Sequence, residues 1–317
     1  MRAQAPVVSI GLPVYNGESF VAEAIRCVLA QTFSDWELIV CDNASTDRTV
    51  AICREFAEQD SRIRVYESPR NMGVTPNFNR VFQLSRGRYF KWIAHDDLFS
   101  PEFIEVCLQG LEQDEGVVLS FPTISYVDAA GHLLRRQTFC LSIMDDAPEA
   151  RIARLTEMER KSADIFWSLY GVIRRDVLER TSLHGFYAGS DQVLLLELAL
   201  SGRLQQVDKD MFFRREHPAA ATLRRDWTAR DWIRFAYADD KRRIAFPYCR
   251  MLKEHLATIR RSDLPFSARM RCICAVLARF ATQWKYFAEE AIWSPLHALR
   301  PVQAQNNPPL SKDVAGH

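Results

Sequence analysis

Glycine is scarce in this chain, with 12 among 317 residues, which is below the average use of about 7%. No two or three of these glycines have the spacing of a dinucleotide-binding fingerprint or of a phosphate-binding P-loop. The sequence therefore excludes the standard nicotinamide dehydrogenases and the P-loop nucleotide hydrolases.

The chain also has no large excess of positive or negative charge. Lys and Arg total 41 and Asp and Glu total 40, so the formal net charge is +1. This balance argues against a chain coated with basic residues, and we expect no nucleic acid partner. With 48% apolar and 26% charged residues, the chain has enough apolar side chains for a large core, which excludes disorder.

The motifs of common zinc sites and redox pairs are absent. The eight cysteines show no Cys-x-x-Cys spacing and lie mostly in apolar runs, which predicts reduced core thiols in a cytosolic protein. The seven histidines include no His-Glu-x-x-His motif, so the sequence does not indicate a zinc site.

Long apolar runs are missing as well. Glu197 and Arg279 interrupt two apolar stretches, and Pro13 breaks a third near the N-terminus. No segment therefore has the length of a spanning helix or the form of a signal peptide. We expect a cytoplasmic protein that does not cross a membrane.

The first 121 residues instead show a regular alternation of strand-like and helix-like segments. Five runs rich in branched and aromatic residues start 26 to 30 residues apart, as strands joined by crossover helices do in a parallel sheet. Between the runs, apolar residues recur at helical steps, and Ser45 or Thr46 can cap the helix after the second run. The five runs are residues 7–12, 37–42, 63–67, 89–94 and 117–121.

The pattern loosens after residue 122. The sequence predicts a hairpin around 128–131 and helices over 148–160 and 191–201. Mostly helical structure is expected from residue 226 to about 293, and the tail from residue 300 is expected to be disordered because it is rich in proline and polar residues.

Two adjacent acids, Asp96 and Asp97, follow the fourth run. Open α/β sheets bind ligands beyond the carboxyl ends of their strands. Two neighbouring carboxylates repel each other unless a cation or a hydroxyl-bearing ligand takes up their charge, which favours a divalent metal and sugar site. The structural alternative, for this pair and for Asp42, is a solvated turn with an acid that caps the next helix.

Several segments at these strand ends form an ordered set of motifs. They are VSIGLPVYN at 8–16, QTFSDWELIVCDNASTD at 31–47, NMG at 71–73 and GRYFKWIAHDD at 87–97. Together they strongly resemble glycosyltransferase family 2. The resemblance implies a GT-A fold, which is a Rossmann-like, mostly parallel open α/β sheet flanked by helices, to which this chain adds a helical C-terminal extension. It also implies a nucleotide-diphosphate-sugar donor, a Mg²⁺ or Mn²⁺ ion, and inversion at the anomeric carbon.

The resemblance assigns roles by position. Pro13, Val14 and Tyr15 match the wall of the nucleotide pocket, and Asp42 matches the residue that hydrogen-bonds the base. Asp96 would hold the ribose or the donor sugar. The other donor-binding positions are Asn16, Glu18, Asn71 and Asn79.

The implied metal ligand is Asp97, and two departures from the family pattern affect its surroundings. Ala94 and His95 stand where family members often have the leading acid of an Asp-x-Asp signature. Residues 77–79 lack the arginine that many members carry before the asparagine that Asn79 matches. A metal held by one direct carboxylate needs diphosphate oxygens to bind well.

Two later positions complete the implied site. Asp191 opens a predicted helix where the family places its catalytic base, which takes the proton of the attacking hydroxyl. His217 ends an Arg-Arg-Glu-His segment that resembles one whose histidine meets the metal or the diphosphate. The structural alternatives are a helix cap for Asp191 and a core histidine for His217.

These assignments divide the chain into four parts. Residues 1–121 would form the nucleotide-sugar-binding half, and 122–225 the acceptor side of the same domain. Residues 226–299 would form a helical, basic extension, followed by the tail at 300–317.

The extension carries an apolar stripe at helical spacing in a basic setting. Residues 241–285 hold eleven Lys or Arg against two acidic residues. The stripe can pack into the core or against a partner. The sharper hypothesis is peripheral contact with the cytoplasmic face of an anionic membrane. The stripe consists of Met270, Ile273, Leu277, Phe280, Trp284 and Phe287.

The sequence therefore favours an inverting glycosyltransferase that acts on a hydroxyl of a glycan or lipid-linked acceptor. The alternative is a non-catalytic subunit that binds a nucleotide sugar within a polysaccharide assembly. A glycoside hydrolase needs two opposed carboxylates, whereas those at 96 and 97 are adjacent. The sugar, the base and the acceptor depend on the region after residue 122, where the sequence does not identify them.

Overall fold

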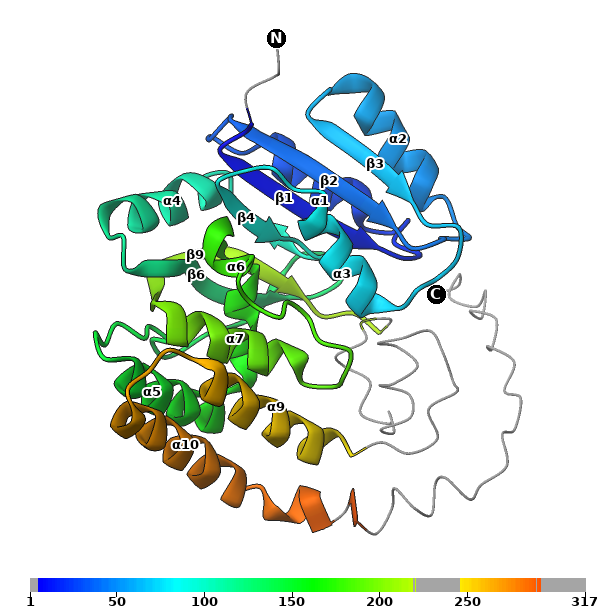
Figure 1. The fold of residues 1–317 in the computed structure, drawn as a ribbon. Helices are drawn as coiled ribbons and strands as arrows, with labels where there is room; N and C mark the ends of the chain where they lie inside the picture. Colours follow the sequence, from blue (N-terminus) through cyan, green and yellow to red (C-terminus); the bar gives the residue numbers. More distant parts are fainter. Residues whose placement is uncertain (1–4, 219, 221–245, 289, 292–317) are drawn as a thin grey trace.

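The computed structural model describes residues 5–218, 220, 246–288 and 290–291, and a nine-stranded sheet forms its centre (Figure 1). The strand order is β3-β2-β1-β4-β8-β6-β9-β5, and β7 pairs with β6. The strands are β1 (Val8–Val14), β2 (Trp36–Asp42), β3 (Ile63–Glu67), β4 (Tyr89–Trp92), β5 (Leu98–Phe99), β6 (Val117–Val127), β7 (Leu133–Arg136), β8 (Val172–Arg174) and β9 (Arg203–Arg215).

The first four strands form the parallel unit that the sequence predicts. β1 pairs with β2 and β4, and β2 pairs with β3, all in parallel. Every residue of β1 and β2 is buried, because helices cover both faces of this part of the sheet. Val14 lies opposite Asp42 in the register of β1 with β2, so the two strands end at the same edge.

The second part of the sheet is not a simple continuation of the first. β8 lies between β4 and β6 and runs antiparallel to both. β6 extends past the predicted run at 117–121 to Val127, because it pairs along its length with β9. The predicted hairpin at 128–131 is confirmed and joins β6 to the exposed β7.

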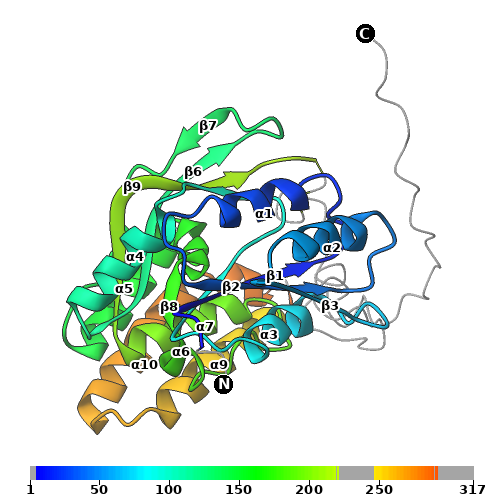
Figure 2. The same cartoon turned by 90° about the horizontal axis from the view of Figure 1, so that it is seen from above.

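Helices cover the sheet on both faces (Figures 1 and 2). α1, α2 and α4 share one core, and α3, α5, α7, α9 and α10 share the other. Along β2, Leu38 and Val40 belong to the first core and Ile39 and Cys41 to the second. The helices are α1 (Val21–Leu29), α2 (Thr49–Gln59), α3 (Val74–Gln83), α4 (Phe103–Gln113), α5 (Pro148–Lys161), α6 (Arg175–Leu178), α7 (Ser190–Ser201), α9 (Pro247–Arg261), α10 (Phe266–Ala281) and the 3-10 helix η1 (Ala163–Tyr170).

The prediction that Ser45 or Thr46 caps α2 is wrong. The helix begins at Thr49, whose N–H donates to Asp47 Oδ1 at 3.0 Å. Ser45 Oγ and the N–H of Thr46 instead bond to Asn16 in the loop after β1. Ser45 and Thr46 therefore join two loops instead of capping α2, and Asp47 accepts the N–H of the first helical residue.

The C-terminal part is helical over α9 and α10, and α10 packs on α5 and α9. No helix in the described part of the chain is long and apolar enough to span a bilayer. Residues 226–245 of the predicted extension and the predicted tail at 300–317 lie outside the described residues. The division of the chain at residues 121 and 225 stays a prediction, and one sheet runs through both of the parts that these boundaries separate.

The eight cysteines are all free thiols. The expected core location holds for four of them, Cys41, Cys53, Cys107 and Cys272, which are buried. The other four are Cys27, which is half-buried, and Cys140, Cys249 and Cys274, which are exposed.

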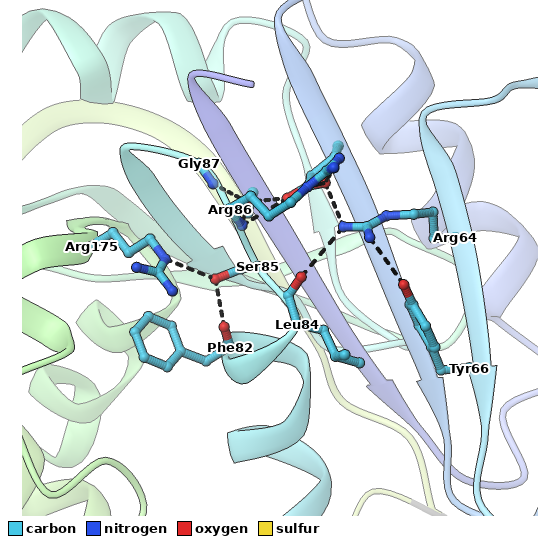
Figure 3. A network of polar contacts seen from close by, with 10 residues as sticks. Arg64, Tyr66, Phe82, Leu84, Ser85, Arg86, Gly87 and Arg175 are labelled. Atoms are coloured by element: carbon cyan, nitrogen blue, oxygen red, sulfur yellow. Dashed lines mark hydrogen bonds and ion pairs between the residues drawn. The ribbon is translucent and has the colours of Figure 1, made fainter. Parts of the chain in front are cut away.

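A polar network around Glu37 ties the amino ends of the parallel strands together, and Figure 3 labels three of its members, Arg64, Arg86 and Gly87. The Glu37 carboxylate accepts bonds from Ser9 Oγ at 2.6 Å, Arg64 Nη2 at 2.5 Å and Arg86 Nη2 at 2.9 Å. The N–H of Gly87 donates to Ser9 Oγ at 2.8 Å. Burial opposes ionisation of Glu37, but the bonds from Ser9, Arg86 and Arg64 outweigh burial and lower its pKa.

Candidate functional site

Asn16 joins the two loops that leave β1 and β2. Its N–H donates to Ser45 Oγ at 2.9 Å, and its side-chain Oδ1 accepts the N–H of Thr46 at 2.9 Å. Asn16 has a φ of 49°, a left-handed conformation that asparagine adopts more readily than most residues. These contacts hold both loops together at the carboxyl edge of the sheet.

Gly17 and Glu18 continue the same loop. The N–H of Gly17 donates to Thr49 Oγ1 at 2.8 Å, and the Glu18 carboxylate accepts the N–H of Arg48 at 3.0 Å. A Cβ at Gly17 would lie 2.7 Å from the ring of His95, so glycine lets this loop approach the turn after β4. Glu18 is therefore engaged in shaping the loop.

The end of β2 presents a buried carboxylate with a spare oxygen. Asp42 is 2% exposed, and its Oδ2 accepts the N–H of Ser45 at 3.0 Å. Its Oδ1 is buried and has no hydrogen-bond partner among the described residues. Asn77 of α3 has the same property: its Nδ2 donates to the carbonyl of Cys41 at 2.8 Å, while its Oδ1 is buried without a described partner. The ends of β1 and β2 thus have two buried acceptors that a ligand can satisfy.

The two other asparagines singled out by the sequence are engaged in the protein itself. Asn71 Oδ1 accepts Asn43 Nδ2 at 2.9 Å and the N–H of Gly73 at 2.8 Å. Asn79 bonds on both sides of its amide to the backbone of His184, at 2.9 and 3.1 Å. Their predicted contact with the donor stays a prediction.

Arg215, the last residue of β9, holds the turn that carries the adjacent acids. Its N–H donates to Asp97 Oδ1 at 2.9 Å, and its Nε donates to the carbonyl of Asp96 at 2.9 Å. The guanidinium also reaches Glu23 of α1 at 2.6 Å and the carbonyl of Ala129. Arg215 therefore fixes the acid turn against α1 and the β6–β7 hairpin. In the sequence, Arg215 is visible only as one residue of the Arg-Arg-Glu-His segment that ends at His217.

His217 lies beside the first acid, as the Arg-Arg-Glu-His motif suggests. Its Nε2 is 3.0 Å from Asp96 Oδ2, and its ring is 4.8 Å from the ring of Phe20. The Asp96 and His217 side chains are 18% and 9% exposed, and Asp97 is 6% exposed. The structure thus brings together three side chains that are up to 121 residues apart in the sequence.

Burial and the like charge of the neighbouring carboxylates dominate the electrostatics of the acid pair. Burial and the neighbouring Asp96 carboxylate raise the pKa of Asp97. Burial also opposes ionisation of Asp96, but the hydrogen bond from His217 outweighs it and lowers the pKa of Asp96. A cation placed at the pair would relieve the repulsion between the two carboxylates.

The donor atoms suit a hard divalent cation as part of its coordination. Carboxylate oxygens are ligands that Mg²⁺ and Mn²⁺ prefer, and Asp96 and Asp97 provide them next to His217. Within the described ranges, no three His, Cys, Asp or Glu side chains form a group that could hold an ion. Phosphate oxygens of a ligand would have to complete the coordination shell.

Asp191 lies in the first turn of α7, which starts after Gly189 in a left-handed conformation with φ of 81°. Burial raises the pKa of Asp191. Tyr170 lies near both Asp191 and the acid turn. Burial raises the pKa of the Tyr170 hydroxyl, and the nearby carboxylates of Asp97, Asp96 and Asp191 raise it further. All three carboxylates therefore lie within electrostatic range of one partly buried ring.

Lys91 of β4 is a buried cation that the sequence analysis missed. Its Nζ donates to the carbonyl of Tyr170 and lies 3.6 Å from the centre of the Phe103 ring. Burial lowers the pKa of Lys91 to about 7, and the charge of Asp97 opposes this change. A lysine in the middle of a buried strand, five residues before Asp96, was the available signal.

The remaining predicted positions, Pro13, Val14 and Tyr15, lie at the end of the first strand, which runs two residues past the predicted run at 7–12. Pro13 and Val14 end β1 and are buried, whereas Tyr15 is 43% exposed at the start of the loop. Asp42 and the acid turn flank this loop, because Asn16 touches the segment after β2 and Gly17 approaches His95. The structure therefore gathers the predicted nucleotide side at one edge of the sheet.

A comparison with known proteins finds a family model that matches more than half of the chain. The family model described as Glycosyl transferase family 2 matches residues 9–181, more than half of the chain. Chondroitin synthase of Escherichia coli is 31% identical over 131 residues, which are 41% of this chain and 19% of that protein. An uncharacterized glycosyltransferase of Rickettsia typhi is 34% identical over 131 residues, 41% of this chain and 40% of that protein. The match thus spans less than half the length of either relative.

Solved structures share the fold at low identity. TarS 1–349 of S. aureus in complex with UDP-GlcNAc has a TM-score of 0.63 at 16% identity, covering 87% of this chain and 72% of that one. The mannosyltransferase PcManGT of Pyrobaculum calidifontis, in complex with GDP-Man and Mn²⁺, has a TM-score of 0.51 at 17% identity, covering 93% and 81%. Both likenesses extend past the residues that the family model matches.

Proposed function

Because the chain belongs to glycosyl transferase family 2, we propose that it moves a sugar from a nucleotide-diphosphate-sugar to an acceptor hydroxyl, with inversion at the anomeric carbon. The observation that carries the proposal is the carboxyl edge of the sheet. There, Asp42 with its unpartnered oxygen and the adjacent acids, half-buried Asp96 and buried Asp97, flank the loop after β1. A nucleoside and a cation-bridged diphosphate would satisfy both features.

The donor would lie against the ends of β1 and β2. Pro13, Val14 and Tyr15 would form the wall of the nucleotide pocket, and Asp42 Oδ1 would accept an N–H of the base, with Asn77 Oδ1 as a second acceptor. Asp96 would hold the ribose or the donor sugar. The ligands bound in the structural neighbours, UDP-GlcNAc and GDP-Man, support this class of donor. On this proposal, residues 1–121 supply the nucleotide side and residues 122–225 the acceptor side.

Asp97 and His217 would hold a Mn²⁺ or Mg²⁺ ion together with the diphosphate. When bound, the ion would stabilise the negative charge that the leaving diphosphate gains. Arg215 keeps the Asp97 carboxylate in place through its N–H. We expect Asp97→Ala to abolish metal-dependent donor binding in calorimetry. Unchanged affinity in the presence of Mn²⁺ would contradict the metal role.

Asp191 would be the general base. An acceptor hydroxyl is a poor nucleophile at neutral pH, so a positioned carboxylate that takes its proton contributes typically about 10²- to 10⁴-fold to the rate. Burial of Asp191 raises its pKa and makes it a stronger base than an exposed aspartate. We expect Asp191→Asn to bind donor normally and to lose transfer. Retained turnover would remove Asp191 from the mechanism.

The overall function is tested with a panel of nucleotide sugars. Thermal shift in the presence of Mn²⁺ identifies the donor that binds, and chromatography then follows release of the nucleoside diphosphate with candidate glycan or lipid-linked acceptors. We expect turnover that depends on the divalent ion. Binding of a nucleotide sugar without any hydrolysis or transfer would favour a non-catalytic binding subunit, an alternative supported by Ala94 at the position of the family's leading acid.

The predicted apolar stripe of the extension is divided between two faces of α10. Phe280 is 3% exposed and Ile273 packs against the core, so these residues stabilise the fold. Met270 and Leu277 face outward and are 39% and 44% exposed. Phe266 at 76% and Trp284 at 70% extend the exposed part of the stripe.

We propose that this outer face of α10 rests on an anionic membrane at its cytoplasmic side, where a lipid-linked acceptor would be located. Exposed Lys253, Arg260, Arg261 and Lys285 lie on or next to α9 and α10, and none of them has an ion-pair partner among the described side chains. Exposed apolar side chains among unpaired basic ones are typical of a surface that binds anionic lipid.

Vesicle flotation tests this contact. We expect the protein to float with phosphatidylcholine vesicles that contain phosphatidylglycerol and not with pure phosphatidylcholine. The double substitution Phe266→Ser and Trp284→Ser should reduce flotation, whereas Leu133→Ser, at an exposed leucine on β7, should not. Equal flotation with both kinds of vesicle, or no effect of the double substitution, would contradict the proposed surface.

A further inference from the structure

The inner face of α10 carries a buried ion pair that lies next to the helix of the proposed base. Arg279 of α10 and Glu159 of α5 have side chains that are 3% and 1% exposed, and Arg279 Nε is 2.5 Å from Glu159 Oε2. From the sequence, Arg279 is one of several basic residues around an apolar stripe. The structure instead turns it toward the protein interior.

The same guanidinium contacts α7. Arg279 Nη2 donates to Gln192 Oε1 at 2.6 Å, and Gln192 directly follows Asp191 in the first turn of that helix. Arg279 Nη1 and Glu159 Oε1 are buried without a hydrogen-bond partner among the residues described. One arginine thus bridges α5, α7 and α10, and it contacts the residue next to Asp191.

Stability alone is a weak reason to keep such a pair. Removing two charges from water costs about as much as their attraction returns, so buried pairs can often be replaced by apolar residues without loss. The surrounding helices already share an apolar core that includes Leu155, Leu195 and Val276. A charged pair at this place is therefore better explained by what it does to the neighbouring carboxylate.

We propose that Arg279 is a positioning residue for Asp191: it fixes the first turn of α7 through Gln192 and keeps the Asp191 carboxylate ionised. The inference rests on the proposed function, in which Asp191 is the base. It makes the C-terminal helices part of the reaction centre, although they lie outside the residues that the family model matches.

The charged and titratable groups around Asp191 shift its pKa in opposite directions. Burial raises its pKa and the positive charge of Arg279 lowers it. Glu159 of α5 and Tyr170 of η1 also lie within electrostatic range of Asp191, and His255 of α9 faces Arg279. Among these groups, Arg279 is the one whose charge favours the ionised form that a general base needs.

The test compares variants by the pH profile of kcat. Arg279→Gln removes the positive charge, so the pKa of Asp191 rises and the acidic limb of the profile moves to higher pH. We expect kcat at neutral pH to fall about 10-fold or more, with little change in the KM for donor. Arg279→Lys retains the charge and should keep the limb near its wild-type position. Gln192→Leu removes only the hydrogen bond and should lower kcat without moving the limb.

Two further variants separate positioning from folding. In the double variant Glu159→Gln and Arg279→Gln, a neutral pair replaces the ion pair, so no charge is left buried alone and Tm should stay near the wild-type value. The acidic limb should still move. Arg271→Gln on the exposed side of the same helix, where the arginine pairs with Glu149, is the matched control and should change neither Tm nor the limb.

The outcomes distinguish this inference from the proposed function. A limb that keeps its wild-type position in both Arg279→Gln and the folded double variant would overturn the role of Arg279, even if Asp191→Asn is inactive. Full activity of Asp191→Asn would instead remove the base itself.

Discussion

At the scale of single residues, the candidate site is marked by side-chain oxygens that lack a partner. Asp42 Oδ1 and Asn77 Oδ1 are both buried near the ends of β1 and β2 without a described hydrogen bond. An unsatisfied buried polar group costs about 1–3 kcal/mol. A ligand that donates to these oxygens would remove that cost, so the cost is a reason to place the nucleotide here.

Asp42→Asn tests this placement. The substitution keeps the shape of the side chain but removes its charge, so we expect the affinity for the nucleoside diphosphate that the wild type binds to fall about 10-fold or more. Isothermal titration calorimetry with UDP and GDP in the presence of Mn²⁺ measures the change. Asp35→Asn, at the exposed residue just before β2, is the control for a charge at the opposite edge. Equal Kd values for the wild type and Asp42→Asn would contradict the placement.

At the scale of elements, the parallel strands are fastened at the edge opposite the site. Glu37 of β2 binds Ser9 of β1, Arg64 of β3 and Arg86 before β4. This network fixes the amino ends of four strands and leaves the loops at their carboxyl ends to serve the ligand. On the proposed function, the Glu37 network and the nucleotide-sugar site therefore lie at opposite edges of the same sheet.

The Glu37 network predicts a pH dependence of stability. The pKa of Glu37 is lower in the folded protein than its ordinary value of 4.5, so the network stabilises the fold above that value and loses this contribution as pH falls below it. We expect Glu37→Gln to lower the free energy of unfolding at pH 7 by about 1–3 kcal/mol. The loss should be smaller at pH 4, as measured by urea denaturation. An equal loss at both pH values would contradict the role of the charge.

Helix α10 offers a test with two adjacent residues. Val276 is fully buried and Leu277 is 44% exposed. We expect Val276→Asp to lower the free energy of unfolding by more than about 3 kcal/mol, because it buries an unpaired charge. Leu277→Asp should have almost no effect on Tm. Similar Tm values for the two variants would show that the helix is oriented differently.

The sequence predicts elements well where one physical pattern dominates. β1, β2 and β4 are recognisable because strands buried on both faces are mostly apolar, and α5 and α7 follow from helical periodicity. Helix α3 was missed because its sequence, VTPNFNRVFQ, contains a proline and two asparagines, and its burial on the sheet outweighs that low helical preference. The three-residue β8 was missed because it exists only through pairing with β4 and β6.

The site is predictable to the same extent. Asp42, Asp96 and Asp97 are visible because parallel strands place their carboxyl ends at one edge. Contacts between distant segments are not visible in this way. Arg215 reaches the acid turn from a strand more than 100 residues later, and Arg279 reaches α7 from a helix that the sequence indicates only as amphipathic.

At the scale of the whole molecule, the later part of the chain returns to complete the earlier part. β9 runs beside β6 and pairs with β5, where Phe213 lies opposite Leu98. Its last residue, Arg215, donates to the buried Asp97. The predicted nucleotide side of the sheet is therefore built from segments more than 100 residues apart in the sequence.

This return of the chain predicts that residues 1–121 do not fold alone. The isolated segment would expose the edge of β4 that pairs with β8, and would leave Asp97 without the N–H of Arg215. We expect a far-ultraviolet circular dichroism spectrum without a cooperative thermal transition. A folded, monomeric fragment with such a transition would contradict this prediction and would show that the boundary at residue 121 separates independent units.

The bridge from Arg279 to the first turn of α7 has a consequence for recombined proteins. A chimaera joined at residue 181, where the family match ends, would keep a carboxylate and its counter-charge from the same parent, whereas one joined between α7 and α10 would mix them. Only the second kind of hybrid should have a pH optimum that differs from those of both parents. A crossover point chosen to change sugar preference would therefore also change the pH at which the hybrid is most active.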